Sequence, residues 1–160
     1  MPVVLVAGFS QPARHRLIQR ALLDLGQSST HQLAWLDHQD AATELAEPAP
    51  NQSFLACVCC SGSLVFSTYL TRLLRQKRWD GLFVSLGAKA EPARILELLK
   101  SVAWAPHLGP VRLFSVMDGL SQRLTEQPEH ALHVMACQQR DLSEAILAPG
   151  QQLPANWWKN

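Results

Sequence analysis

The sequence predicts one α/β domain with three layers, in which a mostly parallel sheet of about six strands carries helices on both faces. Short, strongly apolar runs recur along the chain, and segments with helical periodicity separate them. The chain has 160 residues, of which 48% are hydrophobic, enough for one sizeable core. We therefore expect residues 1–148 to form the domain and residues 149–160 to form a tail.

The first strand and the first helix have the clearest patterns. Val3 to Ala7 is a β-branched apolar run that ends at Gly8, which is typical of a buried parallel strand. Apolar side chains then recur at three- and four-residue steps over residues 12–25, which predicts an amphipathic helix. Pro12 suits the first turn of this helix, and Gly26 suits its end.

Later apolar runs predict five further strands, at residues 33–36, 54–58, 81–86, 111–117 and 131–136. Helices are predicted at residues 69–76 and 91–100. Because helices alternate with strands, the connections should be right-handed crossovers between parallel strands.

The charge of the chain excludes some classes of partner. Fourteen basic and thirteen acidic residues leave a net charge of +1, so we expect no nucleic-acid partner. No apolar run is long enough to span a bilayer, and the first residues lack the pattern of a cleavable leader. We therefore expect a cytoplasmic protein without a membrane partner.

Three of the four cysteines lie close together, at Cys57, Cys59 and Cys60. Such close spacing is poor for disulfides and favours a reducing compartment. In an extended strand Cys57 and Cys59 would point to the same side, so two or three thiolates could converge on a zinc ion. Alternatively, these cysteines are small apolar residues of a buried strand. The sequence leaves both interpretations open.

Five stretches together resemble the nucleotide-binding domain of the CobW-type metallochaperone GTPases, relatives of the urease and hydrogenase maturation GTPases. The stretches are PVVLVAGF, ACVCC, DGLFVSLGAKAEP, VRLFSVMDG and HVMACQQRDL. They follow the family's order of phosphate loop, cysteine signature, glycine-proline segment, fifth strand and guanine-recognition strand. The resemblance implies a P-loop NTPase-like fold over residues 1–148, and we find no counterpart of the family's second domain.

The phosphate loop that the resemblance implies departs from the family pattern in GFSQPARH. Gly8 is kept, but Arg14 stands at the lysine position and His15 at the Ser/Thr position. Pro12 also removes a backbone donor. Histidine does not replace a hydroxyl ligand of Mg²⁺, so we expect neither efficient GTP hydrolysis nor bound GTP and Mg²⁺. Arg14 and His15 are alternatively ordinary polar residues at the start of a helix.

Two residues near the C-terminus complete the candidate sites. Asp141 stands where the resemblance implies a guanine-binding carboxylate, although it suits a helix N-terminus equally well. Cys137 would end the strand predicted at residues 131–136. Because parallel strands present their carboxyl ends at one edge, Cys137 or His15 could complete a metal site with the three clustered cysteines.

Three functions follow as hypotheses. The first is a non-hydrolysing relative of the metallochaperone GTPases that binds zinc or a protein partner. The second is a nucleotide-binding protein in which Arg14 and a helix N-terminus hold the phosphates. The third is an adaptor that binds a protein without any metal. An open nest at residues 8–15 would favour the second hypothesis, whereas a helix filling that space would argue against it.

Overall fold

The structure is a computed structural model that describes residues 1–28, 31–38, 52–55, 63–154 and 157. Within these residues the chain forms one parallel sheet with the strand order β3-β2-β4-β1-β5-β6. The strands are β1 (Val3–Ala7), β2 (Leu33–His38), β3 (Gln52–Leu55), β4 (Gly81–Ser85), β5 (Val111–Val116) and β6 (Ala145–Leu147). The helices are α1 (Gln11–Ser28), α2 (Ser63–Gln76), α3 (Pro92–Lys100), the short 3₁₀ helix η1 (Ala105–His107), α4 (Gly119–Glu126) and α5 (His133–Asp141).

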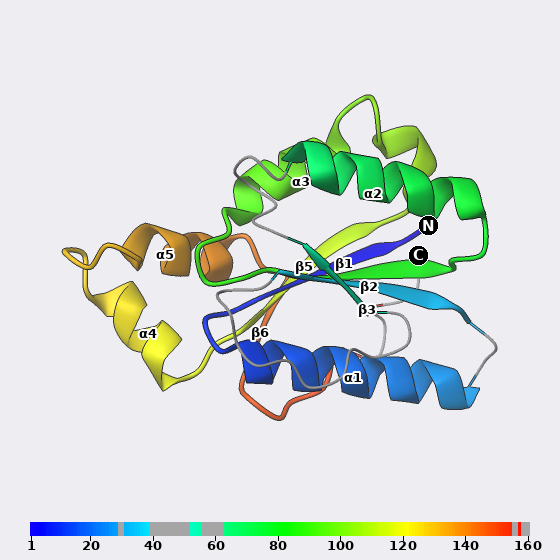
Figure 1. Ribbon diagram of the computed structural model, residues 1–160. Helices are drawn as coiled ribbons and strands as arrows, with labels where there is room; N and C mark the ends of the chain where they lie inside the picture. The colour runs from blue at the N-terminus through cyan, green and yellow to red at the C-terminus, as the bar shows by residue number, and fades with distance from the viewer. Residues whose placement is uncertain (29–30, 39–51, 56–62, 155–156, 158–160) are drawn as a thin grey trace.

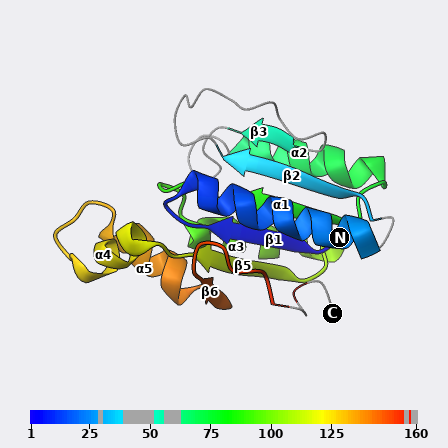
Figure 2. The same ribbon diagram turned by 90° about the horizontal axis from the view of Figure 1, so that it is seen from below.

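Helices cover both faces of the sheet, which confirms the predicted three-layer α/β architecture. Figure 1 shows α2 and α3 on one face and α1 on the other, and Figure 2 shows the same layers from below. Each face has its own core. Val3 and Leu5 of β1 pack with residues of α2 and α3, whereas Val4 and Val6 pack with residues of α1. This alternation follows from the two-residue period of a strand.

The C-terminal tail closes part of the core on the α1 side. Trp157 is 9% exposed, and its ring centroid lies 5.1 Å from that of Phe83 in β4. Leu153 packs against the same cluster. The tail therefore docks on the domain at these residues. None of the described helices is both long and apolar enough to cross a lipid bilayer.

The strand predicted at residues 131–136 is wrong. The chain forms the helix α5 over His133–Asp141, and the sixth strand follows at Ala145–Leu147. A short apolar run does not distinguish a strand from one turn of a buried helix. Alanine, methionine and glutamine are good helix formers, and they occupy most of the middle of this segment.

Further differences concern the bounds of predicted elements and one additional helix. The predicted helix at residues 69–76 begins earlier, at Ser63. Of the strand predicted at residues 54–58, the first two residues lie in β3, and residues 56–58 lie outside the described part of the chain. Helix α4 was not predicted, and Asp118 caps it by accepting a hydrogen bond from the Ser121 backbone N–H at 2.8 Å.

Candidate functional site at the carboxyl edge of the sheet

The connection from β1 to α1 is short and tightly packed. It consists of residues 8–10, because α1 already begins at Gln11. Gly8 has a φ of +147°, and a Cβ built there would lie 2.6 Å from the backbone oxygen of Val116. The Ser10 carbonyl accepts hydrogen bonds at 3.1 Å from the backbone N–H groups of both Ala13 and Arg14. The close contact with β5 therefore requires glycine at position 8. The first turn of α1 occupies the residues whose backbone N–H groups would otherwise surround a phosphate.

Arg14 points into the molecule and is 0% exposed. Its Nε donates a hydrogen bond to the Ser85 hydroxyl at 3.0 Å, and another guanidinium nitrogen donates to the carbonyl of Gly8. The side chain therefore joins the first turn of α1 to the carboxyl ends of β1 and β4. The guanidinium of Arg14 therefore stabilises the fold, whereas the resemblance implied that this position would contact phosphate.

His15 lies beside Asp37 at the end of β2. Its Nε2 is 2.7 Å from Asp37 Oδ2, and the carboxylate is fully buried while His15 is 22% exposed. The two groups touch without the alignment of a hydrogen bond, because Nε2 has no hydrogen-bond partner among the described residues. The His15 and Trp35 rings also pack at nearly right angles, with centroids 5.1 Å apart. These contacts fix the imidazole at the rim of the sheet.

The carboxyl end of β2 continues into His38, which is also buried. His38 pairs in register with Leu55, the last residue of β3. The sequence between β3 and α2 contains Cys57, Cys59 and Cys60, and residues 56–62 lie outside the described part of the chain. The predicted thiolate site therefore stays a prediction. Among the described residues, no group of three or more His, Cys, Asp or Glu side chains could hold a metal ion.

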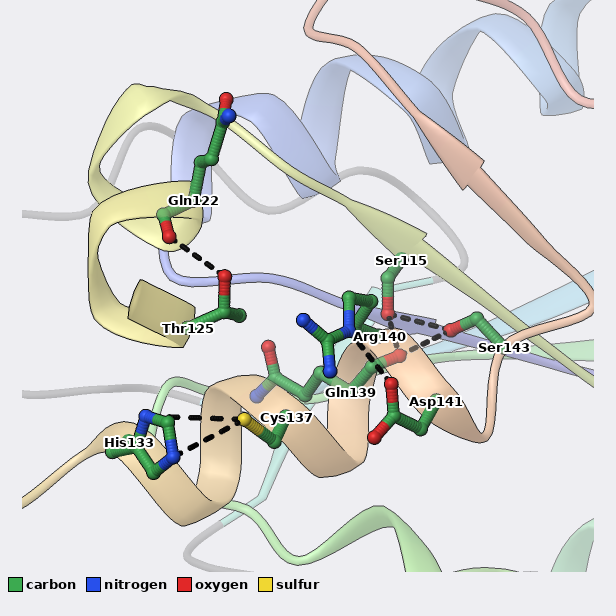
Figure 3. Close-up of polar contacts among 9 residues, drawn as sticks. All are labelled: Ser115, Gln122, Thr125, His133, Cys137, Gln139, Arg140, Asp141 and Ser143. Atoms are coloured by element: carbon green, nitrogen blue, oxygen red, sulfur yellow. Dashed lines mark hydrogen bonds and ion pairs between the residues drawn. The ribbon is translucent and has the colours of Figure 1, made fainter. Parts of the chain in front are cut away.

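Cys137 does not end a strand as predicted, because it lies in the middle of α5. Its Sγ lies 3.6 Å from the Nε2 of His133, one turn earlier in the same helix (Figure 3). The prediction that Cys137 shares the rim of the sheet through a strand end is therefore wrong. Its contact with a histidine was not predicted, although the spacing of four residues in the sequence could have indicated it.

Asp141 is the last residue of α5 and does not follow a strand. Its Oδ1 accepts a hydrogen bond from Arg140 Nε at 2.6 Å, and both side chains are exposed. This hydrogen bond is the main cause of a lowered pKa of Asp141, and the positive charge of Arg140 adds to it. The carboxylate thus already has a cationic partner, and its predicted contact with guanine stays a prediction.

Two serines attach α5 to the sheet. The hydroxyl of Ser115, in β5, donates to the backbone carbonyl of Gln139 at 2.6 Å and lies 2.7 Å from the hydroxyl of Ser143 (Figure 3). Ser115 and Ser85 are both fully buried, and they lie on the two strands that flank β1. In the sequence, each of these two residues is a serine within an apolar run. Such a serine indicates a buried strand position whose hydroxyl needs a hydrogen-bond partner.

No protein-family model, curated protein or solved structure matches this chain.

Proposed function

We propose that this protein binds zinc, or another soft divalent cation, at the carboxyl edge of its sheet, and that it does not hydrolyse GTP. In this proposal it is a non-hydrolysing relative of the CobW-type metallochaperone GTPases that acts in metal handling. The observation that carries the proposal is the pairing of Leu55 with His38. Leu55 directly precedes the cysteine-bearing segment in the sequence, and His38 is its neighbour at the carboxyl edge of the sheet.

The surroundings of these imidazoles fit metal binding. Metal-ligating histidines commonly contact a carboxylate through one ring nitrogen, which orients the ring and leaves the other nitrogen for the metal. His15 has a carboxylate beside it, since Asp37 Oδ2 lies 2.7 Å from its Nε2. Zinc accepts sulfur and nitrogen ligands together, and a transfer site can leave one of its four positions open. The proposed ligands are therefore Cys57, Cys59 and Cys60, with His38 or His15 as a further ligand.

The packing of Arg14 supports the absence of GTP hydrolysis. A phosphate loop needs free backbone N–H groups and a cation that reaches the outer phosphates. The guanidinium of Arg14 is buried, and it donates to Gly8 and Ser85. Releasing it would leave these acceptors without their donor. This argues against the alternative in which Arg14 binds nucleotide.

The proposal is tested by a zinc titration against a chromophoric competitor. The wild-type chain is compared with a variant that carries Cys57→Ser, Cys59→Ser and Cys60→Ser. Loss of the thiolates should weaken zinc binding by roughly a hundredfold or more, because hydroxyls are poor zinc ligands. Cys137→Ser is the matched control and should leave the titration unchanged, since α5 carries this residue and we do not include it among the ligands.

Identical curves for the wild type and the triple variant would remove the zinc proposal.

The proposed absence of GTP hydrolysis is tested with the same proteins by thermal unfolding in the presence of GTP. A ligand that binds only the folded state raises the melting temperature. We expect millimolar GTP with Mg²⁺ to leave the melting temperature unchanged, and a clear rise would instead support the nucleotide-binding alternative.

A further inference from the structure

A second polar site lies on α5, and it contains Cys137 and His133. The two residues are four positions apart in the helix, so they lie on the same face in successive turns. Cys137 Sγ is 3.6 Å from His133 Nε2 and 3.9 Å from Nδ1 (Figure 3). Both residues are partly exposed, so a small molecule in solvent can approach them.

A contact with the neighbouring helix α4 selects the tautomer of the imidazole. His133 Nδ1 lies 2.9 Å from the backbone carbonyl oxygen of Leu124. A carbonyl oxygen only accepts hydrogen bonds, so Nδ1 carries the hydrogen. In the neutral ring the unprotonated nitrogen is then Nε2, which is the nitrogen closer to the thiol. A histidine oriented by a third group beside a thiol is the arrangement that activates cysteine nucleophiles.

A cationic side chain, Arg140, follows Cys137 in the same helix. Arg140 is one turn after Cys137, and its raised pKa has its main cause in the hydrogen bond and charge of Asp141. The negative charge of a Cys137 thiolate contributes in the same direction. A histidine and a cationic side chain near a thiol are typical surroundings of reactive cysteines.

We propose that Cys137 and His133 form a thiol–imidazole pair that undergoes exchange with low-molecular-weight disulfides. The thiol proton passes to His133 Nε2 while Cys137 Sγ forms a bond to one sulfur of the disulfide. The original S–S bond breaks, and the departing thiolate takes the proton from Nε2. Cys137 is oxidised to a mixed disulfide, and the released half of the reagent is reduced to a thiol. No other oxidant is needed.

The chain offers a direct assay for this exchange with glutathione disulfide as the probe. Cleavage after lysine and arginine places Cys137 in the peptide of residues 124–140 and the other cysteines in the peptide of residues 21–72. Mass spectrometry of timed, quenched samples therefore measures the exchange at Cys137 in the full-length chain without removing any other cysteine. This readout is also independent of the zinc proposal.

His133→Gln should slow glutathionylation of Cys137 by roughly tenfold near neutral pH, because the base beside the thiol is lost. His107→Gln is the matched control, since His107 is exposed in η1 and lies far along the sequence from α5. It should leave the rate unchanged. A folded His133→Gln protein that reacts at the wild-type rate would overturn the proposal.

A second measurement covers the case in which His133→Gln does not fold. The wild-type chain is treated with the same probe in buffer and in concentrated urea, where α5 is lost. We expect the rate at Cys137 to be higher in the folded chain, although the residue is partly covered there. An equal or higher rate in the unfolded chain would overturn the proposal.

Discussion

The carboxyl edge of the sheet and the helix α5 both carry clusters of polar side chains, but they differ in how those clusters are built. At the edge, Arg14, Asp37 and Ser85 are fully buried and come from three elements far apart in the sequence. On α5, His133 and Cys137 are partly exposed neighbours within one helix. Buried groups with fixed partners stabilise a fold, because breaking them leaves unsatisfied atoms. Partly exposed groups with weak contacts remain available for chemistry.

The largest expected effect of a single substitution is at Gly8, where the edge is most tightly packed. Gly8→Ala would place a Cβ 2.6 Å from the Val116 oxygen at a φ of +147°. Backbone strain and overpacking together should lower the free energy of unfolding by about 4 kcal/mol. Urea denaturation monitored by circular dichroism measures this change.

Gly150→Ala is the matched control for this experiment. Gly150 also has a positive φ, of +91°, but no atom lies within 4 Å of an added Cβ. Only the strain remains, so the expected loss is about 1 kcal/mol. Equal losses of unfolding free energy at the two glycines would mean that the contact between the β1–α1 connection and β5 is not tight. The edge of the sheet would then be less different from the partly exposed site on α5.

A somewhat smaller effect is expected at Arg14. Arg14→Met keeps a long apolar stem but removes the donors to the Gly8 carbonyl and the Ser85 hydroxyl. Two buried acceptors then lose their donor, which should lower the free energy of unfolding by about 3 kcal/mol. The same urea experiment on Arg16→Met is the control, because Arg16 is exposed on the same helix and should change stability by less than about 0.5 kcal/mol.

If Arg14→Met is as stable as the wild type, the guanidinium does not hold the edge together. Arg14 would then be free to act on a ligand, and the argument against nucleotide binding would fail. The comparison with Arg16 separates this outcome from a general effect of losing a positive charge from α1.

The sequence predicted the three-layer fold because most strands are mainly apolar runs that helical segments separate. Val3–Ala7 and Val111–Val116 are of this kind. The error at residues 131–136 arose where the apolar run was short and its residues favour a helix. The true sixth strand, Ala145–Leu147, has only three residues, too few for a period to be recognised.

The candidate site was harder to predict than the fold. Gly8, Arg14 and His15 were identified by position, but nothing local shows that the Arg14 side chain turns inward. Its partner Ser85 lies 71 residues further along the chain. The contact between His133 and Cys137 is local and was open to prediction, but the segment was interpreted as a strand, in which the two residues would not have the spacing of a helical turn.

The smallest expected effect concerns the exposed pair at the end of α5. The hydrogen bond and charge of Arg140 hold the pKa of Asp141 below its ordinary value. A group with a lowered pKa in the folded state stabilises the fold above its unfolded pKa, and this contribution is lost as pH falls through the folded pKa. Because both side chains are exposed, the stability involved should be small, and an NMR titration of the Asp141 carboxyl is the suitable measurement.

In Arg140→Gln the pKa of Asp141 should rise toward the ordinary aspartate value, whereas Arg123→Gln, an exposed change on α4, should leave it unchanged. A salt titration separates the effect of the Arg140 charge from the effect of its hydrogen bond. At roughly 1 M salt the Debye length is about 3 Å, so the charge interaction is screened while the hydrogen bond at 2.6 Å persists. The pKa should therefore rise less with salt than with Arg140→Gln. If salt alone restored the ordinary pKa of Asp141, Arg140 would act on Asp141 only through its charge. The hydrogen bond at the end of α5 would then be absent in solution, unlike the buried hydrogen bonds at the edge of the sheet.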